Sequence, residues 1–379
     1  MSERKKILYI MHVPWGWIKQ RPHFFADLLS EDYDVDVFYK KSTIVSKKKL
    51  LTKQEDKNNF LRIKGFRYIP CELIPLFRYL HLEWINWFIS LFQLPPFRKY
   101  DYIWITNPRL YSMISRRLSK NNKVIYDCMD DVVEFPIAKR NPIFSHKLLK
   151  NEIALLSTSS IVICSADYLK KKILDRAQLS RRIDVLNNAI ALPDIDIIID
   201  TPDVLRIKNE IRRMQNVFMY IGAISEWFDF DTVCYALKEN PQVHVVLIGP
   251  SDVLIPVHDR IHHFGTVERK FIFSLMSLAN ALIMPFYVNE LIRSVNPVKV
   301  YEYIYSAKPI IIARYEETEK FLDYVYLYSI KEEFSKIMSE IFIGSKKAVN
   351  SANTMKSFSA KNTWHERYRQ LKSILNEYE

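Results

Sequence analysis

Short apolar runs alternate with amphipathic stretches along almost the whole chain. This alternation extends from residue 6 to about residue 190, and it starts again at residue 217. Strands that alternate with helices are typical of parallel sheets whose strands are joined by crossover helices. We therefore expect an α/β protein with two doubly wound, Rossmann-like domains that face a central cleft. The clearest strand-like runs lie at residues 6–13, 33–40, 100–106, 123–130, 159–166, 217–224, 243–250, 280–286 and 308–312.

A stretch without a clear period separates the two series. Residues 191–205 read ALPDIDIIIDTPDVL and indicate a linker. A chain of 379 residues suits two domains of ordinary size. We predict an N-terminal domain at residues 1–192 and a C-terminal domain at residues 193–361. The last stretch, 362–379, has its apolar positions on one side, as expected of a helix that packs back on the N-terminal domain.

Composition narrows the class of protein. Hydrophobic residues make up 49% of the chain and charged residues 26%, which indicates a globular protein. The four cysteines form no CxxC pair and suit a reducing compartment. The first apolar run is only about seven residues long, so it predicts a strand rather than a signal peptide. No segment has the roughly 20 apolar residues that span a bilayer, so we expect a cytoplasmic protein.

The net charge of +12 suggests an anionic partner. Residues 40–64 contain nine Lys or Arg and two acids, and the nearby stretch 80–100 is rich in aromatic residues. A basic loop beside an exposed aromatic helix would suit an anionic membrane, here the inner face of the plasma membrane. The alternative is a solvated loop and a buried helix. No zinc, helix-turn-helix or ribonucleoprotein motif points to nucleic acid.

The stretch RSVNPVKVYEYIYSAKPIII (293–312) carries the most specific chemistry. Asn296 suits a helix N-cap and Pro297 suits the first turn. Lys299 and Glu302 are three residues apart and therefore share one helix face. A helix start, a cation and a carboxylate would suit a ligand with phosphate at one end and hydroxyls at the other, such as a sugar nucleotide. The alternative for Lys299 and Glu302 is an ion pair with each other.

Ligands of doubly wound sheets bind beyond the carboxyl ends of the strands, which singles out further residues. Asp127, Asp130 and Asp131 follow the apolar residues VIY (124–126) near the end of one strand. We favour Asp130 and Asp131 as groups that position an acceptor or act as acid or base, with capping of the next turn as the alternative.

The loop after the first strand supplies the other candidates of the N-terminal domain. Among them, His12 and His23 have structural hydrogen bonding as the alternative, and Trp15 and Trp17 either stack on a sugar or hold the loop. Arg21 would hold an anion or a carboxylate of the cleft.

The ordered motifs resemble GT-B glycosyltransferases, most of all the family 4 type that includes capsule, lipopolysaccharide and teichuronic acid enzymes. The segments YIGAISEWFDFDTVCYAL, VHVVLIGP, HHFGTV, LANALIMPF and NPVKVYEYIYSAKPIII carry the resemblance in the second half. In the first half, WGWIKQRPHFFADLL, which contains Gly16, resembles the opening loop and helix. VIYDCMDD, IVICSADYL and VLNNAI resemble later strands. The resemblance covers nearly the whole chain.

The resemblance implies transfer of a sugar from a nucleotide sugar to a hydroxyl acceptor without an obligatory metal. Glu302 would hold the ribose hydroxyls, and Lys299 and the start of its helix would face the diphosphate. Gly222 and Gly249 would let the backbone approach the donor. The remaining donor candidates are Thr266 and Val267, which would line the base.

This chain departs from the family pattern at several positions. Ser294 stands where many members have a first glutamate. The usual basic pair after the first glycine of the C-terminal domain is missing, so Arg293 and Lys299 are the nearest candidates to neutralise the diphosphate. Ala307 replaces a glycine, which would cost about 1 kcal/mol if the backbone is left-handed there. Met129 stands near the position of a common histidine.

We expect a retaining glycosyltransferase of bacterial surface polysaccharide biosynthesis. Its donor would be a nucleotide sugar, with UDP favoured over GDP, and its acceptor a glycan or a lipid-linked glycan. The alternatives are a sugar-nucleotide epimerase of the same fold and a non-catalytic, nucleotide-sugar-binding partner of an assembly complex. The resemblance implies no cofactor and no obligatory metal. The DFD tripeptide at 229–231 imitates a metal-binding DxD motif, but it lies beside an expected helix start, where acids favour the helix dipole.

Overall fold

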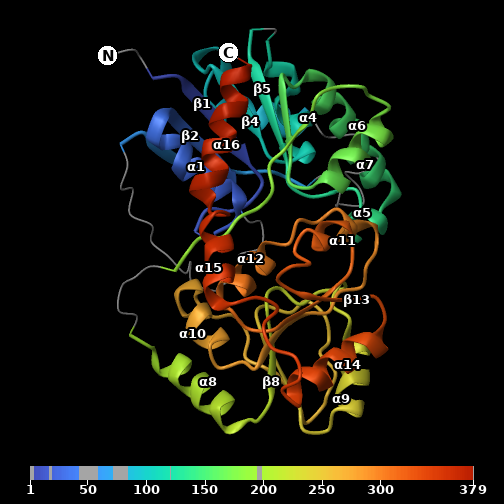
Figure 1. Ribbon diagram of the computed structural model, residues 1–379. Helices are drawn as coiled ribbons and strands as arrows, with labels where there is room; N and C mark the ends of the chain where they lie inside the picture. Colours follow the sequence, from blue (N-terminus) through green and yellow to red (C-terminus); the bar gives the residue numbers. More distant parts are fainter. Residues whose placement is uncertain are drawn as a thin grey trace. The chain divides into compact units, whose positions relative to one another are not determined.

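The computed structural model describes residues 4–16, 19–41, 59–70, 84–119, 121–193 and 199–378. It divides into two compact units (Figure 1). Unit 1 comprises Met1–Asn187 with Trp364–Glu379, and unit 2 comprises Asn188–Thr363. The sequence prediction placed the boundary after residue 192 and the returning segment at 362. Trp17, Cys71 and residues 42–58 of the basic stretch lie outside the described residues.

Unit 1 is built on a parallel sheet of seven described strands. Their order is β3-β2-β1-β4-β5-β6-β7, and each neighbouring pair is parallel. The chain thus moves outward from β1 in one direction, then returns past it to β4. The strands are β1 (Lys6–Met11), β2 (Asp34–Lys40), β3 (Leu61–Phe66), β4 (Tyr102–Ile105), β5 (Lys123–Cys128), β6 (Ile161–Cys164) and β7 (Asp184–Val185).

The helices of unit 1 largely follow the predicted alternation. The pattern of PRLYSMISRRLSK, from residue 108, favours a single helix, but residues 108–117 form three short helical segments in succession. The 17-residue helix α6 and the strand β3 were not predicted. The helices are α1 (Arg21–Asp32), α3 (Trp84–Gln93), α4 (Tyr111–Ile114), α5 (Pro136–Lys139), α6 (Pro142–Thr158), α7 (Asp167–Ala177) and α16 (Trp364–Glu377), with 3-10 turns η2 (Phe97–Lys99), η3 (Pro108–Leu110) and η4 (Ser115–Arg117).

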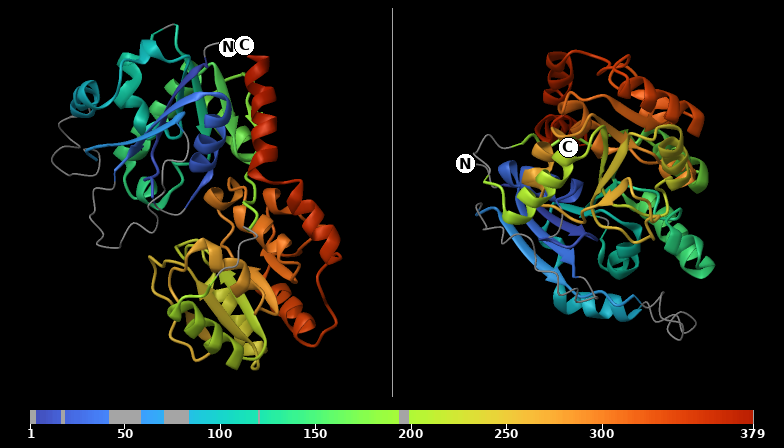
Figure 2. Two further views of the ribbon diagram at one scale, coloured as in Figure 1. Left: turned by 90° about the vertical axis from the view of Figure 1, so that its left-hand side faces the viewer. Right: turned by 90° about the horizontal axis from the view of Figure 1, so that it is seen from below.

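The last helix, α16, packs against the first helix, α1 (Figures 1 and 2). The ring of Trp364 stacks on Phe24 with centroids 4.8 Å apart and meets the edge of Phe25. At the other end of α1, Asp32 accepts hydrogen bonds from the Tyr368 hydroxyl and the Lys372 ammonium, both at 2.7 Å. The C-terminal helix is therefore part of the core of unit 1.

Unit 2 repeats the architecture with six parallel strands in the described residues. Their order is β10-β9-β8-β11-β12-β13. The strands are β8 (Val217–Ile221), β9 (His244–Ile248), β10 (Ile261–His263), β11 (Ala281–Met284), β12 (Ile310–Ala313) and β13 (Tyr326–Tyr328). The helices are α8 (Pro202–Arg213), α9 (Phe230–Glu239), α10 (Ile272–Met276), α11 (Glu290–Arg293), α12 (Val298–Tyr305), α13 (Glu316–Glu319), α14 (Lys331–Phe342) and α15 (Ala352–Ala360), with the 3-10 turn η5 (Arg269–Phe271). The segment 191–205, predicted as a linker, includes the start of α8.

Both sheets confirm the predicted doubly wound α/β fold. In each sheet the first strand lies next to the fourth, so the strand order reverses between β1 and β4 and between β8 and β11. Such reversal points are where open α/β sheets bind ligands. No helix in the described part of the chain is both long and apolar enough to cross a membrane.

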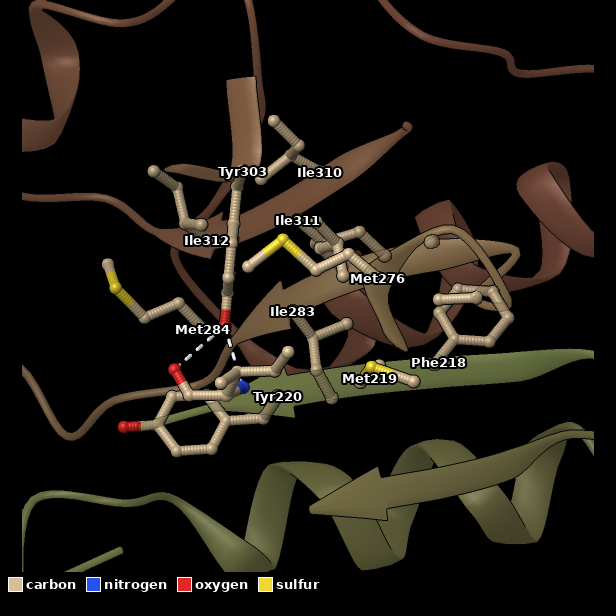
Figure 3. Close-up of a cluster of buried hydrophobic side chains, with 14 of the residues drawn as sticks. Phe218, Met219, Tyr220, Met276, Ile283, Met284, Tyr303, Ile310, Ile311 and Ile312 are labelled. Carbon is tan, nitrogen blue, oxygen red and sulfur yellow. Dashed lines mark hydrogen bonds between the residues drawn. The ribbon is translucent and has the colours of Figure 1, made fainter. Parts of the chain in front are cut away.

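One buried tyrosine fixes α12 against β8 in the core of unit 2. Figure 3 shows Tyr303 crossing from its helix toward β8, past Met284 and Ile312. Its hydroxyl accepts a 2.9 Å hydrogen bond from the amide of Ile221, at the carboxyl end of β8. The side chain is fully buried, so this bond is shielded from water. It holds the helix that carries Glu302 beside the reversal point of the second sheet.

The turn after α12 ends on a strained alanine. Ala307 has φ +55°, in the left-handed region that the missing family glycine implied. A side chain costs roughly 1–2 kcal/mol in that region. We expect Ala307→Gly to raise the free energy of unfolding by about 1 kcal/mol, after allowing for the extra freedom of unfolded glycine. Urea denaturation measures the change. Ala236→Gly, inside α9, should instead be destabilising, and an equal loss in both variants would contradict the interpretation.

Candidate functional site

The carboxylate of Glu302 is buried on α12 between two cations. Glu302 is fully buried. One oxygen accepts from the Arg269 guanidinium and the other lies 3.2 Å from the Lys299 ammonium. Burial raises the pKa of Glu302, but the charges and hydrogen bonds of Lys299 and Arg269 outweigh it and hold the pKa below its ordinary value. Both cations are about one third exposed, so they can also face a ligand.

The segment before α12 differs from the sequence prediction. Asn296 is not the N-cap, because the helix begins at Val298 and Pro297 precedes it without a side-chain cap. Asn296 is buried, and its side chain accepts from the amide of Asn188 at 2.9 Å and donates to Glu317 at 3.1 Å. Asn296 therefore fixes this segment of unit 2 rather than the helix start.

Two other predicted donor residues have their polar groups engaged within unit 2. The Arg293 guanidinium is hydrogen-bonded to Glu290 at 3.0 Å and to Glu316 at 3.1 Å. Ser294 is fully buried, and its hydroxyl donates to the carbonyl of Glu290 at 3.0 Å. A diphosphate would have to compete with two carboxylates for Arg293, whereas Ser294 is enclosed by its own turn.

The two candidate glycines contact each other just beyond the carboxyl ends of β8 and β9. A Cβ on Gly249, which has φ +146°, would lie 1.9 Å from the carbonyl oxygen of Gly222. A Cβ on Gly222 would lie 2.6 Å from the Tyr220 hydroxyl. The protein's own backbone therefore requires glycine at position 249, whereas a side chain at position 222 would require the Tyr220 ring to shift. Thr266 is exposed and Val267 is half-buried in the loop that follows β10.

Both ring nitrogens of His23, a candidate catalytic residue, have partners within unit 1, which favours its structural alternative. His23 is buried on α1, and its Nδ1 accepts from the amide of Gln20 at 3.1 Å. This bond leaves Nε2 as the donor to the carbonyl of Pro14 at 3.1 Å. Burial also lowers its pKa. With both ring nitrogens engaged, His23 closes the loop between β1 and α1, and the half-buried Trp15 ring lies 5.0 Å from it.

The same loop turns at Gly16, whose φ of +83° explains a glycine there. Arg21, at the start of α1, is buried and holds a carboxylate rather than an external anion. Its Nε lies 3.0 Å from Oδ1 of Asp127, and its NH1 donates to the carbonyl of Leu186 at 2.6 Å. The side chains of Arg21 and Asp127 are 2% and 0% exposed, so they form a buried ion pair.

The carboxylate of Asp131, a candidate acid or base, is paired within unit 1, which favours a structural role. The Asp131 side chain is 0% exposed and receives the Arg176 guanidinium at 2.8 Å and the Lys172 ammonium at 3.2 Å. Arg176 also pairs with Glu152 of α6 at 2.5 Å. Burial raises the pKa of Glu152 to about 7. This network joins α6 and α7 to the loop after β5.

Asp130 is the acid of this loop that stays accessible. It is half-buried, and its carboxyl accepts no hydrogen bond from any side chain or amide in the described residues. Burial raises its pKa to about 6, the neighbouring Arg21 lowers it, and Asp127 and Asp131 add to the rise. A carboxylate with a pKa near neutrality can accept and return a proton at working pH.

The raised pKa of Asp130 predicts a pH-dependent stability. Its folded pKa of about 6 lies above its ordinary 3.8, so the folded state binds the proton more tightly than the unfolded state. The contribution of Asp130 to the free energy of unfolding is therefore fully present below pH 4 and is lost as the pH rises through 6. We expect Asp130→Asn to be more stable than the wild type by up to about 2 kcal/mol at pH 8, and by nothing at pH 4. Urea denaturation across this range measures it. A gap independent of pH would contradict the interpretation.

His12 lies at the reversal point of the first sheet. Its Nδ1 is 2.9 Å from Oγ1 of Thr106, which follows β4. Burial, together with the smaller effects of the charges of Lys40, Arg109 and His23, lowers the pKa of His12 to about 3, so the ring is neutral at physiological pH. The ring can exchange one hydrogen bond with a ligand but carries no charge.

The acids of the DFD tripeptide have partners of their own. Asp229 caps α9, accepting from the Thr232 amide at 2.8 Å, and Asp231 accepts from the Tyr287 hydroxyl at 2.8 Å. In the described ranges no group of three or more His, Cys, Asp or Glu is placed to hold a metal ion.

Sequence reasoning missed Arg269 and Arg109. Arg269 follows the GTV segment, and only folding places it beside Glu302, 33 residues later. Arg109 lies in η3, between the rings of Tyr68 and Phe144. A signal for the Asp131 network was present, because Lys172 and Arg176 are four residues apart on one face of α7.

Comparisons with known proteins give one curated relative. TuaH of Bacillus subtilis (strain 168), assigned to teichuronic acid biosynthesis as a glycosyltransferase, is 26% identical over 241 residues. The match covers 60% of this chain and 59% of the relative, so the chain spans less than two thirds of that relative's length. No protein-family model matches the chain.

Solved structures match over nearly the full length. HepE from Anabaena, in complex with UDP and glucose, has a TM-score of 0.65 and 15% identity, covering 99% of this chain and 100% of its own. A trehalose-6-phosphate synthase, studied for glycosyl transfer with retention, has a TM-score of 0.63 and 11% identity, covering 98% and 99%. At these identities the likeness concerns the architecture.

Proposed function

We propose that this chain, which has the GT-B fold, is a glycosyltransferase that moves a sugar from a UDP-sugar to a hydroxyl of a glycan or lipid-linked acceptor. The proposal includes retention of the anomeric configuration and a role in bacterial surface polysaccharide biosynthesis. Its main support is the buried Glu302 between Lys299 and Arg269, at the reversal point of the second sheet. A carboxylate with two acceptor oxygens matches a ribose cis-diol, and the cations match a diphosphate.

The relatives support the choice of donor and pathway. HepE binds UDP and glucose, and TuaH is assigned to teichuronic acid biosynthesis. The bond from the anomeric carbon to the diphosphate breaks as the acceptor oxygen bonds to the same face of the sugar. Lys299 and Arg269 would stabilise the charge that develops on the leaving diphosphate. Asp130 would take the acceptor's hydroxyl proton, and no metal is required in this scheme.

Donor turnover tests the proposal. The protein is incubated with UDP-glucose or other nucleotide sugars, with and without a lipid-linked glycan, and UDP release and the product anomer are measured. UDP release that requires the acceptor, with an unchanged anomeric configuration, is the expected result. Conversion of the donor's sugar without acceptor would favour the epimerase. Nucleotide binding without turnover in either condition would favour the non-catalytic partner.

We also propose that α3 contacts an anionic membrane surface. Trp84, Phe88, Leu91 and Phe92 are 43–78% exposed on this helix. Arg98 and Lys99 are exposed in the following turn, and Arg116 lies 5.5 Å from the Trp87 ring. Exposed aromatic residues flanked by cations complement acidic headgroups.

Cosedimentation with vesicles tests this surface. We expect binding to phosphatidylglycerol vesicles that Phe88→Ser with Phe92→Ser lowers by about 10-fold or more. Leu254→Ser, at an exposed apolar position of unit 2, is the matched control and should bind like the wild type. Equal binding of all three proteins would exclude α3 as the contact.

A further inference from the structure

One cation at the end of β2 and another that follows β4 lie near His12, beyond the carboxyl ends of the strands of the first sheet. Lys40 ends β2, and Arg109 lies in η3, directly after β4. The strands β2 and β4 lie on either side of β1, whose end leads into His12. The cations therefore flank the point where the strand order reverses, which is the place where such sheets bind ligands.

One aromatic ring holds both side chains. The Lys40 ammonium lies 5.3 Å from the centroid of the Tyr68 ring, and the Arg109 guanidinium lies 5.1 Å from the same centroid. The guanidinium is also 5.4 Å from the Phe144 ring. Both rings are buried, whereas both cations are half-exposed. Cation–π contacts thus hold both side chains at this end of the sheet.

The charges of Lys40 and Arg109 act on a common region. Both help to lower the pKa of His12, after the larger effect of burial. At the same edge, β5 leads to Asp130, the acid with the raised pKa. The edge is therefore polarised, with cations beyond β2 and β4 and an acid beyond β5. From β2 to β5 is three strand spacings, roughly 14 Å, which accommodates a sugar ring and an attached charged group.

We propose that Lys40 and Arg109 form an oxyanion subsite that recognises a phosphate or carboxylate group on the acceptor sugar. The inference rests on the proposed function, because only a transferase has an acceptor. The two cations themselves both lie in unit 1. A guanidinium fork suits the paired oxygens of either group, and an ammonium adds a second point charge. The acceptor's anionic group binds at the cations, and its reacting hydroxyl points to Asp130.

Binding without nucleotide tests the subsite. Glucose 1-phosphate, glucuronate and neutral methyl glucoside are titrated by calorimetry into the wild type, Lys40→Met and Arg109→Gln. We expect one or both anionic sugars to bind at least about 10-fold more tightly than methyl glucoside, and each substitution to weaken that binding by about 10-fold or more. The tighter of the two anionic sugars distinguishes a phosphate from a carboxylate.

Matched variants separate recognition from folding. Arg116→Gln removes another cation that lies over an aromatic ring of unit 1 and should leave binding unchanged. Lys40→Arg and Arg109→Lys keep the charges and should restore most of the binding, and thermal unfolding checks that each variant is folded. The proposal is overturned if no anionic sugar binds at millimolar concentration, if the neutral glycoside binds as well, or if the double variant Lys40→Met, Arg109→Gln still binds.

UDP binding to unit 2 provides an independent readout. All these variants should keep the wild-type response to UDP, because the substitutions lie in unit 1. If the wild type does not bind UDP, the proposed function is rejected, and the test of the oxyanion subsite is unaffected. Conversely, normal UDP binding with equal binding of charged and neutral sugars would reject only the subsite.

Discussion

Glu302→Gln is expected to lose most of the stabilisation that UDP gives to the wild type. A ligand at 100 times its Kd stabilises by about 2.7 kcal/mol. Losing a charged hydrogen-bonding group costs about 1.5–3 kcal/mol of affinity, roughly 10-fold to 100-fold. At the same UDP concentration the variant would therefore gain only about 0.4–1.4 kcal/mol. Thermal and urea unfolding, with and without UDP, measure both values.

Glutamine is preferred to alanine because it keeps the shape of the buried side chain. Lys299 and Arg269 are about one third exposed, so water can solvate them in the variant. Glu340→Gln is the control, since it removes a carboxylate that pairs with Lys346 at 3.5 Å near the end of α14. A full UDP response in Glu302→Gln would mean that Glu302 forms an ion pair and does not contact the nucleotide.

Asp127→Ala is expected to destabilise unit 1 by about 3–5 kcal/mol. The substitution leaves the Arg21 guanidinium buried, with 2% of its side chain exposed, and without its carboxylate. The hydrogen bond from Arg21 to the carbonyl of Leu186 persists, but a neutral carbonyl does not replace the charge of a carboxylate. Urea unfolding followed by circular dichroism measures the loss.

A double variant distinguishes loss of the Arg21–Asp127 ion pair from the cavity that a smaller side chain leaves at position 127. Arg21→Met with Asp127→Leu removes both charges and fills the space, so it should be much more stable than Asp127→Ala. If Asp127→Ala alone costs less than about 1 kcal/mol, Arg21 must reach water by another path, and the ion pair contributes little.

The fold was largely predictable because each strand and helix is specified locally. The apolar runs of the sheets and their spacing predicted both doubly wound units. The single helix favoured from residue 108 was wrong, because an amphipathic pattern does not show where a helix breaks into the short segments η3, α4 and η4. The helix α6 escaped notice because its apolar positions are interrupted by polar ones, including Glu152, which the fold buries beside Arg176.

The site was predictable only where its partners are close in sequence. Lys299 and Glu302 are one helical turn apart, so their contact follows from spacing. The sequence favoured Asp130 and Asp131 over Asp127, but it could not separate the first two, because Arg176 reaches Asp131 from the distant helix α7. Asp130 is the acid of the three that stays accessible, and only the folded structure shows that the other two are paired.

The return of α16 to unit 1 has a consequence for synthesis on the ribosome. Phe24 and Phe25 cannot pack against Trp364 until the whole of Asn188–Thr363 has been made. At about 5–20 residues per second this takes roughly 10–35 s, far longer than the collapse of a domain. During that time Phe24 and Phe25 lack the Trp364 ring that covers them, and exposed apolar surface of this kind promotes aggregation. A message truncated before codon 364 would yield a chain that keeps that surface exposed.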